Sequence, residues 1–191
     1  MGIQKGEPGY IKAQKTKYLI WTIAEFAIVI VLVVLGYIQT GSRLNLFTVI
    51  AVVGCLPAAK MLVELITIWP HCSIRPDIYQ EIEEKAPLLT KAYDLVITGN
   101  DKVMPVDAFV ISGHTVCGFA SSQRTDGAKL SAYLKEMLKN NHVEKVTVKV
   151  FHDYTAFLAR AEGMNNIMTV DRPAGREREN TIRQLFLAVS M

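Results

Sequence analysis

Few residues of this 191-residue chain combine the side-chain types and the spacing that chemistry requires. Asp107 is the only carboxylate in the run from Pro105 to Ile111, where its side chain could serve as an oxygen ligand. A single carboxylate makes a poor magnesium site, since this ion needs an octahedral set of oxygen ligands. A structural interpretation is equally open, in which Asp107 points to the solvated face of a strand. The face of the strand on which Asp107 lies therefore distinguishes these two interpretations.

The cysteines and histidines form no complete catalytic or metal-binding set. Cys55, Cys72 and Cys117 lack C-x-x-C spacing and cannot all pair within one chain. His114 and Cys117 suggest a base and a nucleophile, but no third, orienting residue can be identified, and a cysteine in a strand is typical of a core. The adjacent His71 and Cys72 do not easily face one ligand. We expect no metal site, no cofactor, and thiols kept reduced in the cytosol.

Two long apolar runs place the chain in a membrane. They extend over residues 18–38 and 44–68 and are separated only by Gln39–Arg43. Because a helix needs about 20 apolar residues to cross a bilayer, the pattern predicts a transmembrane hairpin over residues 18–69. A cleaved signal peptide is excluded, since the first run is too long and a second span follows at once.

Ionisable residues inside the predicted spans are costly and therefore informative. Glu25 lies at the depth of Lys60 if both helices rise equally from the turn, and Glu64 follows Lys60 by one helical turn. We expect Glu25, Lys60 and Glu64 to form a charge group that locks the hairpin. Pro57 removes a backbone donor and is expected to kink or break the second helix near residue 56.

Basic residues before the first span predict the orientation. Residues 1–17 are expected to be a mobile cytosolic arm, and Lys12, Lys15 and Lys17 within it outweigh the single Arg43 of the turn. Because short loops rich in lysine and arginine remain in the cytoplasm, both termini are predicted to be cytoplasmic. The same three lysines are predicted to contact lipid headgroups. The protein is thus expected to be a multi-pass protein of the cell membrane.

The rest of the chain, after a linker at residues 70–76, predicts one small α/β (α+β) domain over residues 77–191. Apolar periodicity favours helices at 77–92, with a division at Pro87, at 126–140, after Asp153 and at the C-terminus. Strands are predicted at 95–98, 106–112, 115–120, 146–150 and 167–170. The turn at Ser112–His114 predicts a hairpin, and the crossover through 126–140 predicts a parallel pair, which together make a mixed sheet.

The order helix, three strands, helix, strand, together with the run Pro105–Val116, resembles the core of restriction-endonuclease-like nucleases of the nuclease-related-domain type. The resemblance covers about residues 78–151. In that family an Asp, a Glu and a Lys bind a divalent metal and activate water for phosphodiester cleavage, and Asp107 matches the Asp. Where the Glu and Lys of the E-x-K motif would stand, the chain reads Cys117–Ser121 instead. The resemblance therefore implies a scaffold that has lost its chemistry.

Three functions follow as expectations. The first is a small integral membrane protein whose hairpin anchors a non-catalytic cytosolic α/β domain for interaction or ligand sensing, with the lipid bilayer and a protein partner or a second copy as its contacts. The second is a membrane-tethered metal-dependent nuclease that uses Asp107 with Asp94 or Asp101, in which a divalent metal would be required. The third is a subunit of a pore-forming oligomer that uses Glu25, Lys60 and Glu64. The small net charge of +3 gives no argument for nucleic acid.

Overall fold

The computed structural model covers residues 1–191 and describes residues 3–41, 46–99, 102–168 and 175–191. The chain divides into two compact units. One unit contains residues 11–72, and the other contains residues 1–10 together with residues 73–191. The short segment before the first helix thus belongs to the same unit as the C-terminal domain.

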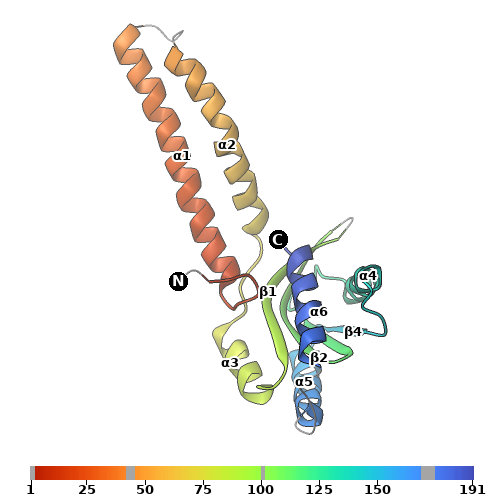
Figure 1. Ribbon diagram of the computed structural model, residues 1–191. Helices are drawn as coiled ribbons and strands as arrows, with labels where there is room; N and C mark the ends of the chain where they lie inside the picture. The colour runs from red at the N-terminus through yellow and green to blue at the C-terminus, as the bar shows by residue number, and fades with distance from the viewer. Residues whose placement is uncertain (1–2, 42–45, 100–101, 169–174) are drawn as a thin grey trace. The chain divides into compact units, whose positions relative to one another are not determined.

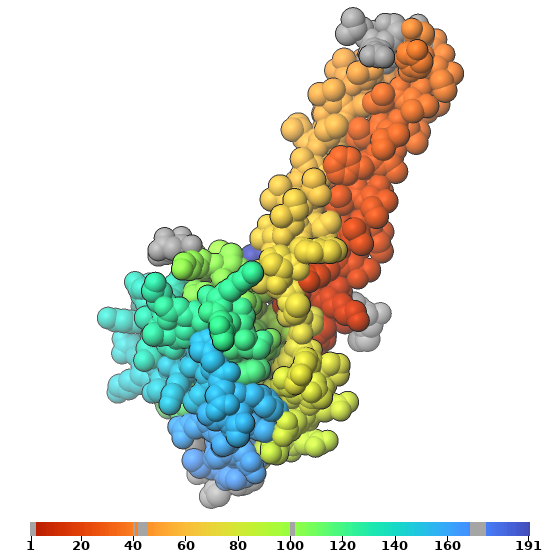
Figure 2. Space-filling view, turned by 180° about the vertical axis from the view of Figure 1, so that it is seen from behind, coloured from red at the N-terminus to blue at the C-terminus, as the bar shows by residue number. Residues whose placement is uncertain are grey.

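The first unit is a pair of long helices, α1 (Tyr10–Thr40) and α2 (Leu46–Ile68). They run side by side in opposite directions (Figure 1), and the space-filling view shows them in contact along their length (Figure 2). Small residues permit this approach, because Ala51 and Ala58 of α2 are buried and Gly54 lies against Val29. Both helices are long and apolar enough to cross a membrane, as judged by length and composition.

Two features of these helices differ from the sequence expectations. Helix α1 begins at Tyr10, so residues 10–17 are its first two turns and not part of an irregular arm. Lys, Ala and Gln are good helix formers, which explains why the helix extends beyond the apolar run. Helix α2 is continuous through Pro57, so the expected break near residue 56 is not found. Proline is tolerated in membrane helices because neighbouring groups can satisfy the freed carbonyl.

The second unit is a small mixed sheet with helices on both faces. Its elements are α3 (Pro76–Lys85), β1 (Thr90–Thr98), β2 (Val103–Ser112), β3 (Thr115–Phe119), α4 (Gly127–Asn140), β4 (Thr147–Phe151), α5 (Tyr154–Met168) and α6 (Arg176–Val189). In the described part of the chain the strand order is β1-β2-β3-β4. The first three strands are antiparallel, and β4 is parallel to β3 after the α4 crossover. The predicted mixed α/β architecture is confirmed.

Each face of the sheet has its own hydrophobic core. Helices α4 and α6 cover one face, where Phe109 packs on Phe186 with ring centroids 4.9 Å apart. Helices α3 and α5 cover the other face, where Phe157 and Cys117 are buried with Ile82. Burial of these side chains supplies the main driving force for folding of the domain.

Two local expectations about the domain were wrong. Residues 77–92 were expected to be helical on both sides of a division at Pro87, but α3 ends at Lys85 and β1 begins at Thr90. Pro87 interrupts the helix, and pairing of β1 with β2 then outweighs local helical preference. A fifth strand was expected at residues 167–170, but α5 continues to Met168, and residues 169–170 lie outside the described part.

Gly118 offers a test of this packing. A Cβ atom at Gly118 would lie 2.7 Å from Cε1 of Phe109, so Gly118→Ala is expected to destabilise the domain by about 1–3 kcal/mol. Gly163 in the exposed face of α5 has nothing within 4 Å of such an atom, so Gly163→Ala is expected to stabilise by about 0.5–1 kcal/mol. The opening free energy from hydrogen exchange of β3 amides measures both. Equal effects of the two substitutions would contradict the packing described.

Candidate functional site at the edge of strand β1

Strand β1 lies at the edge of the sheet, and both ends of the chain cover it. The backbone N–H of Tyr93 donates to the Gly6 carbonyl at 2.9 Å, and the Met191 N–H donates to the Val96 carbonyl at 2.9 Å. An uncovered edge strand would present a row of unpaired backbone groups. The N-terminal and C-terminal segments therefore complete the domain on this side.

Asp94 is the central residue of this edge. It is 2 % exposed, and its Oδ2 accepts a hydrogen bond from the Gly9 backbone N–H at 2.8 Å. Its Oδ1 accepts another from the Ile74 backbone N–H at 2.7 Å. Gly9 immediately precedes α1, and Ile74 follows the end of α2 at Ile68 by six residues. One buried carboxylate thus binds both segments that connect the domain to the helical hairpin.

The backbone of β1 places Asp94 in this position. The ladder pairs Tyr93 with Ala108 and Leu95 with Val106, but it skips Asp94 and the opposite residue, Asp107. Asp94 has a φ of 54°, a left-handed conformation that Asp tolerates better than most residues. Side chains of a regular strand alternate between its two faces, so residues 92 and 95 would face opposite sides. Ala92 and Leu95 nevertheless belong to the same core, so the alternation shifts by one residue here. This irregularity directs the Asp94 carboxylate toward the segments at Gly9 and Ile74, which are not part of the β1–β2 pair.

Two further contacts fix the N-terminal segment, which is therefore not a free arm over residues 4–9. Gly6 has a φ of 87°, and a Cβ atom there would lie only 2.7 Å from Cδ2 of Leu187 on α6. The Lys5 ammonium donates to the Ser190 carbonyl, and partial burial lowers the pKa of Lys5 below its ordinary value. We name this group the junction cluster, which consists of Lys5, Gly6, Gly9, Ile74, Asp94 and Ser190.

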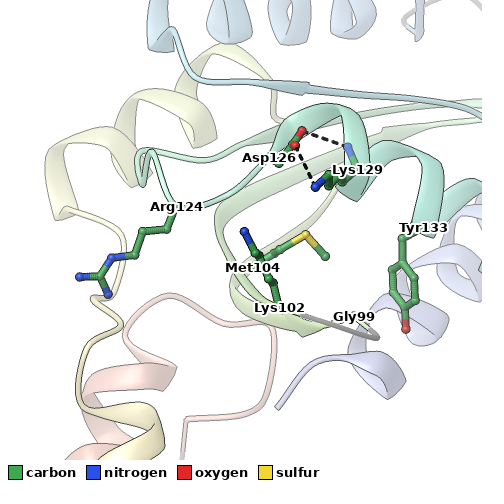
Figure 3. Close-up of a pocket in the computed structure, with 7 residues that line it drawn as sticks. All are labelled: Gly99, Lys102, Met104, Arg124, Asp126, Lys129 and Tyr133. Atoms are coloured by element: carbon green, nitrogen blue, oxygen red, sulfur yellow. Dashed lines mark hydrogen bonds and ion pairs between the residues drawn. The ribbon is translucent and has the colours of Figure 1, made fainter.

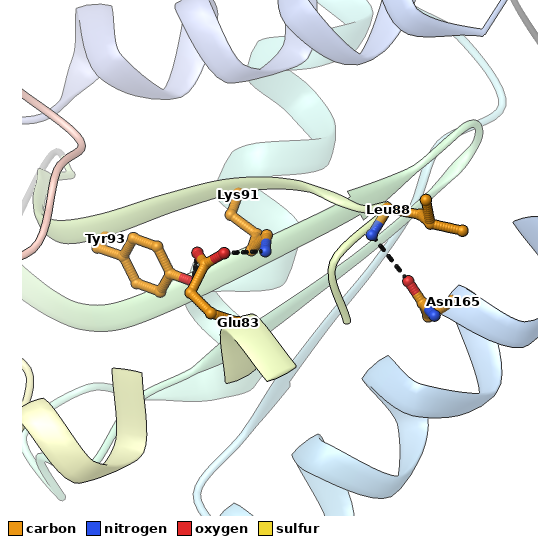
Figure 4. Close-up of polar contacts among 5 residues, drawn as sticks. All are labelled: Glu83, Leu88, Lys91, Tyr93 and Asn165. Carbon is orange, nitrogen blue, oxygen red and sulfur yellow. Dashed lines mark hydrogen bonds and ion pairs between the residues drawn. The ribbon is translucent and has the colours of Figure 1, made fainter. Parts of the chain in front are cut away.

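A second polar group attaches α3 to the start of β1. Glu83 accepts from the Lys91 ammonium at 2.6 Å and from the Tyr93 hydroxyl at 2.8 Å (Figure 4). Burial, and then the hydrogen bond to Glu83, raise the pKa of Tyr93 above its ordinary value. In the same figure the Leu88 N–H donates to Oδ1 of Asn165 at 2.9 Å. These groups are mutually satisfied, so we interpret them as structural.

Asp107, the catalytic candidate from sequence, has a structural partner. It is half-buried on β2, and its Oδ2 accepts from the Ser121 N–H at 2.6 Å, which holds the loop after β3. Asp94 is engaged in the junction cluster, and Asp101 lies outside the described residues. Among the described residues, no group of three or more His, Cys, Asp or Glu side chains could hold a metal ion.

The Cys117 and His114 pair is not brought together. Cys117 is 1 % exposed, contacts the Met164 sulfur at 3.5 Å, and has its pKa raised by burial, whereas His114 is exposed on the turn. The expectation of a core cysteine is confirmed. All three cysteines of the chain are free.

The membrane charge group is only partly formed. Lys60 Nζ lies 3.9 Å from Glu64 Oε1, as the one-turn spacing predicts. The expected pairing of Glu25 with Lys60 is not found, because the Lys60 side chain is 73 % exposed, whereas Glu25 Oε2 is buried. This Glu25 atom has no hydrogen-bond partner in the described part of the chain.

The three lysines expected at lipid headgroups all lie in the first two turns of α1. Lys12 and Lys17 are exposed. Lys15 Nζ lies 5.8 Å from the centroid of the Trp69 ring near the end of α2, a distance that allows a cation–π interaction. The cation at Lys15 therefore also joins the two helices at one end of the hairpin.

Comparisons with known proteins add no relative. The chain matches no protein-family model, and no curated protein or solved structure is significantly similar to it. The resemblance to restriction-endonuclease-like nucleases consequently stays a prediction.

The junction cluster predicts a specific weakness in Asp94 variants. Asn at this position retains the size and the left-handed tolerance, but its amide nitrogen cannot accept a hydrogen bond, so one of the two amides loses its acceptor. Hydrogen bonds to charged groups contribute about 1.5–3 kcal/mol, so Asp94→Asn is expected to speed tryptic cleavage after Lys5 in the full-length protein by about tenfold or more.

Asp153 provides the matched control for this experiment. Its Oδ1 accepts from the Thr155 N–H at the start of α5 and takes no part in the junction cluster. Asp153→Asn is therefore expected to leave cleavage after Lys5 unchanged. Wild-type resistance to trypsin in Asp94→Asn would show that the carboxylate does not hold the N-terminal segment.

Proposed function

We propose that this protein is a membrane-anchored, non-catalytic α/β domain that serves in interaction or ligand sensing. Its helical hairpin crosses the bilayer twice and returns the chain to the side from which it came. Both termini and the domain lie in the cytoplasm. The lipid bilayer surrounds the hairpin, and a protein partner or a second copy contacts the exposed part.

The observation that carries this proposal is the position of the two connecting segments. Gly9 before α1 and Ile74 after α2 donate to the same Asp94 carboxylate. Two groups bound to one buried side chain must lie on one side of a membrane. An even number of crossings between them satisfies this requirement, and two helices of sufficient length and apolarity stand between them.

The outer surface of the hairpin supports its insertion into lipid. Large apolar side chains are exposed along both helices, including Ile20, Ile30 and Ile38 of α1 and Val52 and Leu56 of α2. Exposed apolar surface of this extent marks an interaction with lipid or another protein. The lysines in the first turns of α1 then support a cytoplasmic location for this end, because such residues resist translocation.

The candidate catalytic side chains are already engaged in structural contacts, and this supports the non-catalytic part of the proposal. The carboxylates of Asp94 and Asp107 both accept backbone hydrogen bonds that hold chain segments in place. Cys117 is buried against Met164 and has no histidine partner in the described residues. Each of these side chains has a structural role, which leaves binding as the function that the geometry supports best.

Impermeant thiol labelling tests the topology. In a Cys55→Ala, Cys72→Ala background, single cysteines at Ile3, Gln39 and Lys139 report on the N-terminal segment, the end of α1 and the domain. Ile3→Cys and Lys139→Cys are expected to react only in inside-out vesicles, and Gln39→Cys only in intact spheroplasts. The buried Cys117 is retained, and the background protein without added cysteines measures its reactivity.

Two results would contradict the proposal. Labelling of Ile3→Cys and Lys139→Cys from opposite sides would require an odd number of crossings and would separate Gly9 from Asp94. Labelling of all three positions from the same side would show that the hairpin does not cross the membrane.

A further inference from the structure

The domain contains a pocket of about 190 Å³ that is separate from the junction cluster. It lies where the end of β1, the start of β2, the loop after β3 and the first turns of α4 meet, and Figure 3 shows its lining residues. These residues are Gly99, Lys102, Met104, Arg124, Asp126, Lys129 and Tyr133. None of them was a candidate in the sequence analysis.

The rim of this pocket is positively charged. Among the described lining residues, Lys102, Arg124 and Lys129 contribute three cations, and Asp126 contributes one carboxylate. Lys129 Nζ lies 4.0 Å from an Asp126 oxygen, whereas Lys102 and Arg124 form no ion pair within the described part of the chain. The uncompensated charge favours an anion.

Asp126 has a second role beside its ion pair with Lys129. Its Oδ1 accepts from the N–H groups of Ala128 and Lys129, both at 3.1 Å, and so caps the start of α4. The positive end of the helix therefore stabilises this carboxylate. The same contacts mean that an anion in the pocket would be held by side chains and not by the helix terminus.

The interior of the pocket is apolar. Met104 is 6 % exposed, and its side chain lies between Lys102 and the Asp126 end of α4, while the ring of Tyr133 stands at the opposite side (Figure 3). The Arg124 side chain extends away from the Asp126–Lys129 pair in the same view. Exposed side chains rotate within nanoseconds, so Arg124 can turn toward a bound anion.

Size and charge together define the ligand class. Sites for drug-sized molecules measure about 300–1,000 Å³, so this pocket suits a smaller group. A phosphate monoester carries close to two negative charges, and the described lining residues have more cations than carboxylates. Arginine and lysine are the usual partners of phosphate oxygens. Met104 and Tyr133 would then contact a short carbon backbone attached to the phosphate.

We propose that this pocket binds a phosphate monoester on a small carbon backbone, of the glycerol phosphate type. The proposal deepens the ligand-sensing part of the proposed function and rests on it for its biological meaning. Binding itself depends only on the pocket. Such a group occurs both as a free metabolite and as the headgroup of phosphatidic acid, and the two sources share the chemistry that the pocket recognises.

Calorimetric titration of glycerol 3-phosphate into the full-length protein in phosphatidylcholine nanodiscs tests the proposal. The wild-type protein is expected to bind saturably, and the Lys102→Gln, Arg124→Gln variant to bind at least about tenfold more weakly. Lys135→Gln, Lys139→Gln is the control, because it removes two exposed cations from α4 outside the pocket. It is expected to bind as the wild type does.

A second arm of the experiment separates the two sources. If phosphatidic acid added to the nanodiscs abolishes the heat of glycerol 3-phosphate binding in the wild type, a lipid headgroup occupies the pocket. If the heat persists, a free phosphate monoester is the ligand, and both results support the shared chemistry. Absence of binding by folded wild-type protein, or equal weakening in both double variants, would overturn the proposal. Nanodiscs expose both faces of the protein, so an error in the proposed topology would not affect this result.

Discussion

The carboxylate of Asp94 is the constraint on which the rest of this structure depends. A buried carboxylate is stable only when its oxygens accept hydrogen bonds, and here both acceptors are used by backbone groups of segments distant in the sequence. Gly9 and Ile74 lie on either side of a helical hairpin that spans more than fifty residues. Because the Asp94 carboxylate accepts from both Gly9 and Ile74, the domain needs chain segments from before and after the hairpin to be complete.

The N-terminal segment also decides which residues make up the domain. The N-terminal segment contributes to the edge of β1 through Gly6 and Gly9, so the domain is not formed by residues 73–191 alone.

The sequence predicted the elements whose signals are local. Apolar length indicated both hairpin helices, Asp126 indicated the start of α4, and the turn at Gly113 indicated the β2–β3 hairpin. It did not predict that β1 begins at Thr90, because pairing with β2 outweighs the helical pattern there. The role of Asp94 was also missed, since it requires contacts 20 and 85 residues away. Two glycines close together at positions 6 and 9, followed later by a lone Asp in an apolar strand, were the available signal.

Amide hydrogen exchange by NMR on the lipid-embedded full-length protein tests the central claim most directly. If Asp94 binds both connecting segments, the Gly9 and Ile74 amides are protected, although each lies outside regular helix or strand, and their opening free energies are similar. Exchange of the Gly9 amide at the rate of an unstructured chain, beside a protected Ile74 amide, would contradict the account. That result would show that the N-terminal segment is not part of the domain.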